Sequence, residues 1–277
     1  MSEKPQTPAI QQEPITDKVL AKVTQFQELG QLVLPDGYHA GNSLKSASLI
    51  LAETVNAKGE PALKVCTSGS VANSLLEMVV QGLNPIKGQC SFIVRGNKLC
   101  MQREYAGTIA IAKREYPIDL PKAHVVFEGD IFKYETNPNN GRIRIIEHTT
   151  ELKNRDITKI VGAYCIIPFT DGTSDVEVMS MAEIRKAWEQ GATKGNSPAH
   201  RNFPDQMAEK TVINRALKRY VNSTGDPIAD IITDDEQKQT HETKDVLFEE
   251  INIDQEMQTP EPVQIAEPIK TDEKHPF

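Results

Sequence analysis

The sequence predicts an α+β fold, in which an antiparallel, β-hairpin-rich sheet packs against helices. Helical patterns, with apolar residues three and four positions apart, fill the first part of the chain. A block of short strand-like runs joined by tight turns follows, with one helix inserted in it, and helical patterns then return. Because strands and helices are segregated along the chain, the pattern favours α+β over an alternating α/β fold.

The N-terminal helices are predicted from their periodicity and end signals. The first begins at Thr16, with Thr16-Asp17 as its expected cap. The second covers residues 44–56, and the third covers 70–81, with Ser70 as N-cap and Gly82 as a stop signal.

The middle of the chain is predicted to form strands and tight turns. The expected strands cover 91–95, 98–102, 123–127, 131–135, 142–148, 161–169 and 176–179. Turns are expected at Gly96-Asn97, at 137–141 (NPNNG) and at Asp171-Gly172. A helix over 107–113 separates the first two strands from the others.

Two more helices are expected at the end of this region. The sequence SMAE, Ser180 to Glu183, has the form of a capping box, and the helix it opens carries the only tryptophan, Trp188. After a flexible loop over 189–200, a longer helix is expected from Pro204 to Tyr220.

Charge and composition divide the chain into three parts. Residues 1–15 are rich in Pro, Gln and Glu and are expected to be disordered, whereas residues 16–225 are expected to form one domain. Residues 226–277 carry 15 acidic and 4 basic residues, a net charge of −11, and the rest of the chain carries 27 basic and 24 acidic residues, a net charge of +3. An acidic tail on a basic body favours nucleic-acid binding or an interaction tail.

Several classes of function lack support in the sequence. The four cysteines show no CxxC spacing, so we expect buried thiols in a reducing cytoplasm, without a disulfide framework or a zinc site. No apolar run is long enough to span a membrane, and the N-terminus has no signal-peptide core. No GxxxxGK[ST] motif or His/Cys cluster occurs, so no nucleotide, metal or other cofactor is expected.

The helix over 204–220 has a basic face. Its polar side presents Lys210, Thr211, Asn214, Arg215, Lys218 and Arg219, opposite an apolar stripe. From Lys210 to Arg219 that face has no acidic residue, so neighbours four positions away should not neutralise these cations. The interpretation is a helix that faces phosphates, and the alternative is an amphipathic helix with a solvated charged side.

The predicted hairpin and the helix after it offer a second basic region. The candidate DNA-binding residues there are Arg95, Lys98, Gln102, Arg103, Tyr105 and Lys113. Basic side chains beside an aromatic ring can follow a phosphate backbone and stack a base. The alternative is a surface hairpin with a structural tyrosine.

A metal-dependent nuclease is a rival interpretation. Glu151 and Lys153 form an ExK triplet, and Asp130 precedes it. Two carboxylates can hold Mg²⁺ while the lysine positions a water molecule. Such triplets are common by chance.

Four segments in order, QGLNPIKGQCSFIV, MQREYAG, VVFEGDIFKYE and MAEKTVINRALKRY, resemble the RecT family of phage-type single-strand annealing proteins, or recombinases. The resemblance runs roughly from Ser70 to Tyr220. Two departures lie beside Tyr105: Ala106 stands where the family usually has a basic residue, and Glu104 where glycine is common.

The resemblance implies a DNA-binding and annealing domain over 16–225, with a fold related to Rad52-type annealing proteins. It implies ATP-independent binding of single-stranded DNA and annealing to duplex DNA in recombination and repair, without catalysis, because base pairing supplies the free energy. A homo-oligomer (ring or helical filament), a partner exonuclease and a host single-stranded-DNA-binding protein are also implied. A passive single-stranded-DNA-binding module is the remaining alternative. The last six residues, DEKHPF, loosely resemble a docking peptide of bacterial single-stranded-DNA-binding proteins, and an ordinary chain end is the alternative.

Overall fold

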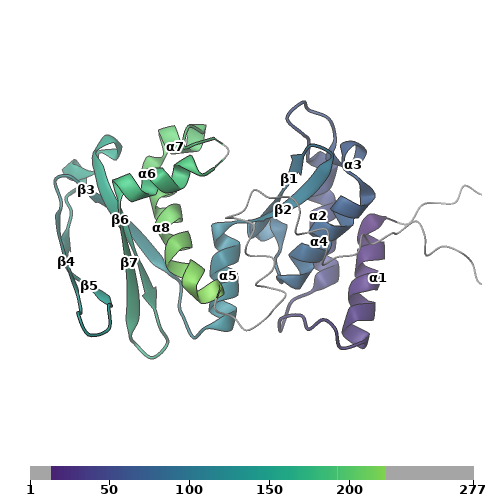
Figure 1. Ribbon diagram of the computed structural model, residues 1–277, viewed down its shortest axis with the longest axis horizontal. Helices are drawn as coiled ribbons and strands as arrows, with labels where there is room; N and C mark the ends of the chain where they lie inside the picture. Colours follow the sequence, from purple (N-terminus) through teal and green to yellow (C-terminus); the bar gives the residue numbers. More distant parts are fainter. Residues whose placement is uncertain (1–13, 192, 223–277) are drawn as a thin grey trace, which may run out of the picture.

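The computed structural model describes residues 14–191 and 193–222, which form two lobes joined by one helix (Figure 1). The N-terminal lobe contains α1 (Ile15–Glu28), α2 (Ala40–Glu53), α3 (Ala62–Val65), α4 (Ser68–Val80), η1 (Pro85–Lys87), β1 (Cys90–Arg95) and β2 (Lys98–Arg103). The C-terminal lobe contains β3 (Lys122–Phe127), β4 (Ile131–Thr136), β5 (Ile143–Thr149), η2 (Leu152–Asn154), η3 (Ile157–Lys159), β6 (Ile160–Pro168), β7 (Ser174–Ser180), α6 (Met181–Glu189), α7 (Pro198–Asn202) and α8 (Pro204–Val221). The joining helix is α5 (Tyr105–Glu115).

All strand pairs are antiparallel, which confirms the predicted α+β class. The strands form a β1-β2 hairpin, a three-stranded sheet in the order β3-β6-β7, and a β4-β5 hairpin. Arg95 pairs with Lys98 across the Gly96-Asn97 turn, so the predicted register of the first hairpin is confirmed. Helix α8 packs on β3, β6 and β7 and supplies much of the core of this lobe.

Two predicted helix caps are wrong. Helix α1 begins after Pro14 without a side-chain cap, and Thr16 is buried within the helix. The N-cap of α4 is Thr67, whose hydroxyl accepts the N–H of Ser70. The Ser70 hydroxyl instead accepts the Leu99 N–H at 3.1 Å, so a tertiary contact with β2 determines its role.

Helix α4 ends in a Schellman motif, as the predicted stop signal requires. Gly82 has a φ of +61°, its N–H bonds the carbonyl of Val79, and the N–H of Leu83 bonds that of Met78. The carbonyl of Gln81 accepts a hydrogen bond from Arg114 at 3.2 Å. A cation on α5 thus stabilises the C-terminus of α4 and ties the two helices together.

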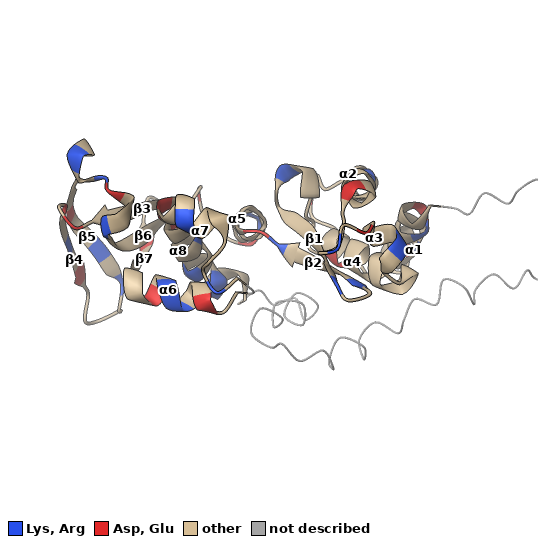
Figure 2. Ribbon diagram, turned by 90° about the horizontal axis from the view of Figure 1, so that it is seen from above, with Lys and Arg blue, Asp and Glu red and all other residues tan. Residues whose placement is uncertain are grey.

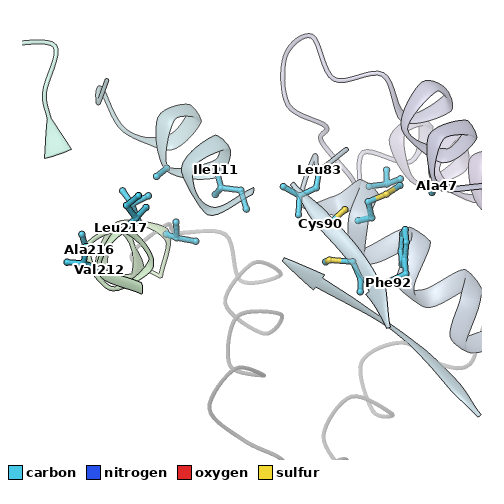
Figure 3. Packing of buried hydrophobic residues seen from close by; sticks show 14 of the residues in the cluster. Ala47, Leu83, Cys90, Phe92, Ile111, Val212, Ala216 and Leu217 are labelled. Carbon is cyan, nitrogen blue, oxygen red and sulfur yellow. The ribbon is translucent and has the colours of Figure 1, made fainter. Parts of the chain in front are cut away.

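Helix α5 makes the core continuous between the lobes. Figure 3 shows Ile111 of α5 between Leu83 and Cys90 of the N-terminal lobe and Leu217 of α8. Gly107 allows the close approach, since a Cβ at this position would lie 2.2 Å from the carbonyl oxygen of Gln89. Gly107, the last residue of the MQREYAG segment, therefore has a packing role.

Helix α6 begins as predicted, but the region after it differs from the prediction. The Ser180–Glu183 capping box is confirmed, because each residue's side chain bonds the other's backbone N–H. The expected loop over 189–200, however, includes the start of α7, capped by Ser197. This helix is only 5 residues long, so its periodicity was too short to detect.

The cysteines are all free thiols in the described part of the chain. Cys90 and Cys165 are buried, and burial raises the pKa of each thiol to about 12. Cys66 and Cys100 are partly exposed, so the prediction of burial is confirmed for two of the four. Among the described helices, none is long and apolar enough to cross a membrane.

Candidate nucleic-acid interface

A cavity of about 520 Å³, here called the first cavity, lies where α6 and α8 meet the end of β2. Its lining includes four cationic side chains, one carboxylate and the tryptophan: Arg103, Lys186, Arg215, Lys218, Glu183 and Trp188. Because cations outnumber the carboxylate, the cavity favours anionic ligands. Figure 2 shows the mixed charge of α6, where a basic stretch lies between acidic ones.

Helix α8 brings three of the predicted residues to this cavity. Its buried side consists of Ala208, Val212, Ile213, Ala216, Leu217 and Val221. Asn214, Arg215 and Lys218 lie on the other side and line the first cavity. Lys218 lies three positions after Arg215 and four after Asn214, so it neighbours both on the helix surface.

Arg103 joins these side chains from the other lobe. It is the last residue of β2, where it pairs with Cys90, and its guanidinium bonds the side-chain oxygen of Gln81 at 3.4 Å. Arg103 is therefore the one predicted hairpin residue that lines the same cavity as the predicted residues of α8. Their convergence was not evident from the sequence, since α5 and the whole C-terminal sheet separate them along the chain.

Lys210 of α8 lies beside Tyr105, the first residue of α5. The Lys210 ammonium lies 5.5 Å from the centre of the Tyr105 ring and 3.1 Å from a carboxylate oxygen of Glu104. Tyr105 is 39% exposed, which leaves part of its ring accessible to a ligand. Neither residue lines the first cavity, so their predicted contact with DNA requires a path beyond it.

Four other predicted residues, Arg95, Lys98, Gln102 and Lys113, do not line the first cavity. All four are exposed. Arg95 and Lys98 lie at the turn of the β1-β2 hairpin, and Lys113 lies in the last turn of α5. Contact between DNA and these four residues stays a prediction.

Three of the four cations of α8, Lys210, Arg215 and Arg219, are paired with carboxylates outside the helix, contrary to the sequence argument. Arg215 lies 2.9 Å from Glu177 and 3.5 Å from Glu183, and Arg219 lies 2.8 Å from Glu177. The side chain of Glu177 is 14% exposed. The argument failed because it considered partners within the helix only, whereas Glu177 projects from β7. Arg215 thus holds a mostly buried carboxylate in addition to lining the first cavity.

Glu183 is held by the start of its own helix as well as by Arg215. The pKa of this carboxyl is lowered, first by the backbone N–H of Ser180, then by the Ser180 hydroxyl and by Arg215. It therefore stays ionised at neutral pH and offsets part of the positive charge of the first cavity. Lys186 and Lys218 line the same cavity and form no ion pair within the described residues.

The residues of the nuclease interpretation occupy structural positions. The buried Asp130 carboxylate accepts the Phe127 N–H at 2.9 Å and also contacts Asn154 and His148. Burial alone would raise the pKa of Asp130, but these donors and Thr150 lower it. Glu151 is exposed and pairs with Lys153. In the described part of the chain, no group of three or more potential ligand side chains is placed to hold a metal ion.

Lys186 and Trp188 are among the cavity residues that were absent from the predicted site. Both lie on α6, whose capping box and unique tryptophan had been noted without a functional role. The indole N–H of Trp188 donates to the Thr211 hydroxyl at 2.8 Å, which fixes α6 against α8. The combination of a tryptophan beside basic residues was the available signal.

The fold and the site together define an α+β protein with a cationic cavity built by both lobes, a site suited to a phosphodiester backbone. The model of the RecT family matches residues 42–247, and the chain belongs to this family. The chain is also 26% identical over 180 residues to Protein RecT of Escherichia coli strain K12. That match covers 61% of this chain and 64% of the relative. The chain therefore spans less than two thirds of the relative's length. The implied relation to Rad52-type annealing proteins fits this family.

Proposed function

We propose that the protein binds single-stranded DNA in the first cavity and anneals it to a complementary strand in homologous recombination, without ATP and without catalysing bond cleavage. The observation that carries the proposal is the convergence of Arg103, Lys186, Arg215 and Lys218 on one cavity from both lobes. Family membership supports the same function.

The mechanism follows from the charges at the cavity. Lys186 and Lys218 act as point charges toward phosphates, and Arg103, whose guanidinium also bonds Gln81, adds a further cation from the other lobe. Contacts to the backbone leave the bases free, so a complementary strand can pair with them. Base pairing and stacking supply the free energy of annealing. We further propose a homo-oligomer, ring or filament, that acts in the cytoplasm beside an exonuclease and a host single-stranded-DNA-binding protein.

A fluorescence assay with two complementary oligonucleotides, free of metal and nucleotide, tests this function. Wild type should accelerate annealing, and K186A/K218A should bind and anneal more weakly. The matched control is K45A/K58A, because these lysines are exposed, lie on the N-terminal lobe and do not line the first cavity. Binding without annealing would support the passive module instead, and degradation on addition of Mg²⁺ would support the nuclease.

The salt dependence of binding offers an independent measure. The logarithm of the binding constant should fall linearly with the logarithm of salt concentration, with a slope of about −0.7 for each phosphate neutralised on a single strand. Affinity should vary little with base sequence, because backbone contacts and stacking suit any base. A slope near zero, or a strong preference for one sequence, would contradict the proposal.

A further inference from the structure

A second cavity, of about 280 Å³, adjoins the first. It lies between α6, α7 and the segment that leads into β6. Trp188 lines both cavities, so the two share a wall. The polar lining of the second cavity includes Arg185, Arg201 and His200, and it contains no carboxylate.

Contacts on two sides hold the shared wall in place. The Trp188 indole N–H donates to Thr211 on α8 at 2.8 Å. The Trp188 and His200 ring centres lie 4.7 Å apart in an edge-to-face arrangement. His200 in turn bonds the Ser197 hydroxyl at the start of α7. These contacts fix α6, α7 and α8 relative to one another, and with them the basic residues at both cavities.

Adjacent residues of α6 serve the two cavities. Lys186 lines the first, and Arg185 lines the second. A helix rotates by about 100° per residue, so neighbours in sequence face different directions. Helix α6 thus presents a cation on each side of Trp188, and Arg201 of α7 adds another to the second cavity.

The arginines of the second cavity differ from Arg215 in their partners. Arg215 is engaged by two carboxylates, whereas Arg185 and Arg201 are exposed and form no ion pair or side-chain hydrogen bond within the described residues. The pKa of His200 is lowered, first by burial and then by the charge of Lys210, so its ring is neutral at neutral pH. The positive charge of the second cavity therefore comes from two arginines whose donors are available to a ligand.

We propose that Arg185 and Arg201 form a second phosphate subsite, so that a DNA strand bound in the first cavity passes Trp188 and continues into the second. This inference rests on the proposed function and extends the path of the same strand. Arginine suits the role because its planar donors can bind two oxygens of one phosphate.

Strand length separates the two cavities in an experiment. Binding of oligothymidylates of increasing length is measured for wild type, R185A/R201A and the control K45A/K58A, which loses the same charge far from both cavities. The shortest oligonucleotides, which fill the first cavity alone, should bind R185A/R201A and the control alike. Longer ones should bind R185A/R201A about tenfold more weakly than the control, with the magnitude of the salt slope reduced by about 1.4 for two lost phosphates.

The single tryptophan gives a local readout. Because Trp188 is the only tryptophan of the chain, its fluorescence reports on the wall between the cavities. Long oligonucleotides should change this emission in wild type, and R185A/R201A should show a smaller change at saturation. Thermal melting of R185A/R201A should match that of the control, since neither arginine carries an ion pair in the described structure.

Three results would overturn the inference while leaving the proposed function intact. R185A/R201A binding long oligonucleotides as the control does would exclude the second subsite. An equal loss at every length would mean that the arginines serve the first cavity. A fluorescence response to inorganic phosphate but not to DNA would assign a small-anion site. If wild type binds no single-stranded DNA, the proposed function itself fails.

Discussion

The Lys210 ammonium lies 3.1 Å from the Glu104 carboxylate, and this ion pair joins α8 to the residue just before α5. Glu104 also accepts a hydrogen bond from the Ser91 hydroxyl at 2.9 Å. Glycine is common at this position in the family, whereas here Glu104 neutralises Lys210, a residue predicted to bind DNA. The pair is partly exposed, so it stabilises the fold only modestly.

The substitution Glu104→Gln should therefore tighten binding of single-stranded DNA. The amide side chain would have nearly the same shape as the carboxylate and could still accept from Ser91, but it would leave the charge of Lys210 for a phosphate. We expect a gain of a few-fold, in line with the free energy of an exposed ion pair. Fluorescence anisotropy checks this, with Glu28→Gln, an exposed change on α1, as the control of equal charge. Equal affinities for the two variants would show that Lys210 does not reach the DNA.

Substitutions of Arg215 and Lys218 should have different effects on stability. Arg215→Ala removes one of the two arginines that contact the mostly buried Glu177 within the described residues, and it removes the arginine that contacts Glu183. A loss of about 1 kcal/mol, discounted for the partial exposure of Arg215, lowers the melting temperature by roughly 2–4 °C in a domain of this size.

Lys218→Ala should melt as wild type does, because Lys218 forms no ion pair in the described residues, and yet bind DNA more weakly. If Arg215 and Lys218 faced DNA without competition, Arg215→Ala would lose more binding, because a guanidinium can bind two oxygens of one phosphate. Glu177 and Glu183 compete with DNA for Arg215. The order of the two binding losses therefore tests which of these side chains contacts DNA in the first cavity. Melting temperature and DNA affinity are measured for both variants. Unchanged affinity in both would exclude this face of α8 from the DNA-binding site.

Asp130 should stabilise the fold in a manner that depends on pH. Its pKa is lowered below the ordinary 3.8 in the folded state. A carboxyl whose folded pKa is depressed stabilises the protein above its unfolded pKa, and this contribution is lost as pH falls through the folded value. Asp130→Asn should therefore be less stable than wild type at neutral pH, and the difference should shrink below a pH of about 4.

Denaturant unfolding at several pH values measures this difference. Glu151→Ala is the companion variant, since Glu151 is exposed and pairs only with exposed Lys153. It should anneal within a few-fold of wild type. A Mg²⁺-dependent cleavage activity that disappears in Glu151→Ala would restore the nuclease interpretation.

The acidic tail should compete with DNA for the basic body. Residues 226–277, which lie outside the described residues, carry a net charge of −11. Deletion of residues 230–277 should tighten single-stranded-DNA binding, most clearly at low salt, where screening is weak. Weaker binding by the shortened protein would rule out electrostatic competition and indicate that the tail contributes to binding.

The sequence predicted the elements whose signals are local. The β1-β2 hairpin followed from Gly96-Asn97, and α8 followed from Pro204 and its apolar stripe, because turn chemistry and periodicity act over a few residues. The caps at Thr16 and Ser70 were wrong because tertiary packing determined where those hydroxyls lie.

The candidate site was predicted only in part, since it depends on contacts between distant elements. The sequence identified Arg103, Asn214, Arg215 and Lys218, which meet at one cavity. It could not show that Glu177 of β7 reaches Arg215, because no local pattern links a strand to a helix so far along the chain. Nor could it place Trp188, whose partner Thr211 lies on another helix.

The continuous core through α5 has a consequence for how ligands act on the whole protein. Because apolar side chains of both lobes pack in one cluster, heat should unfold them together in a single cooperative transition. A strand that binds only the folded form should shift this transition upward by mass action. Mutations deep in the N-terminal lobe, such as Leu44→Ala, should therefore weaken apparent DNA affinity by reducing the folded population, without altering any group that touches the strand.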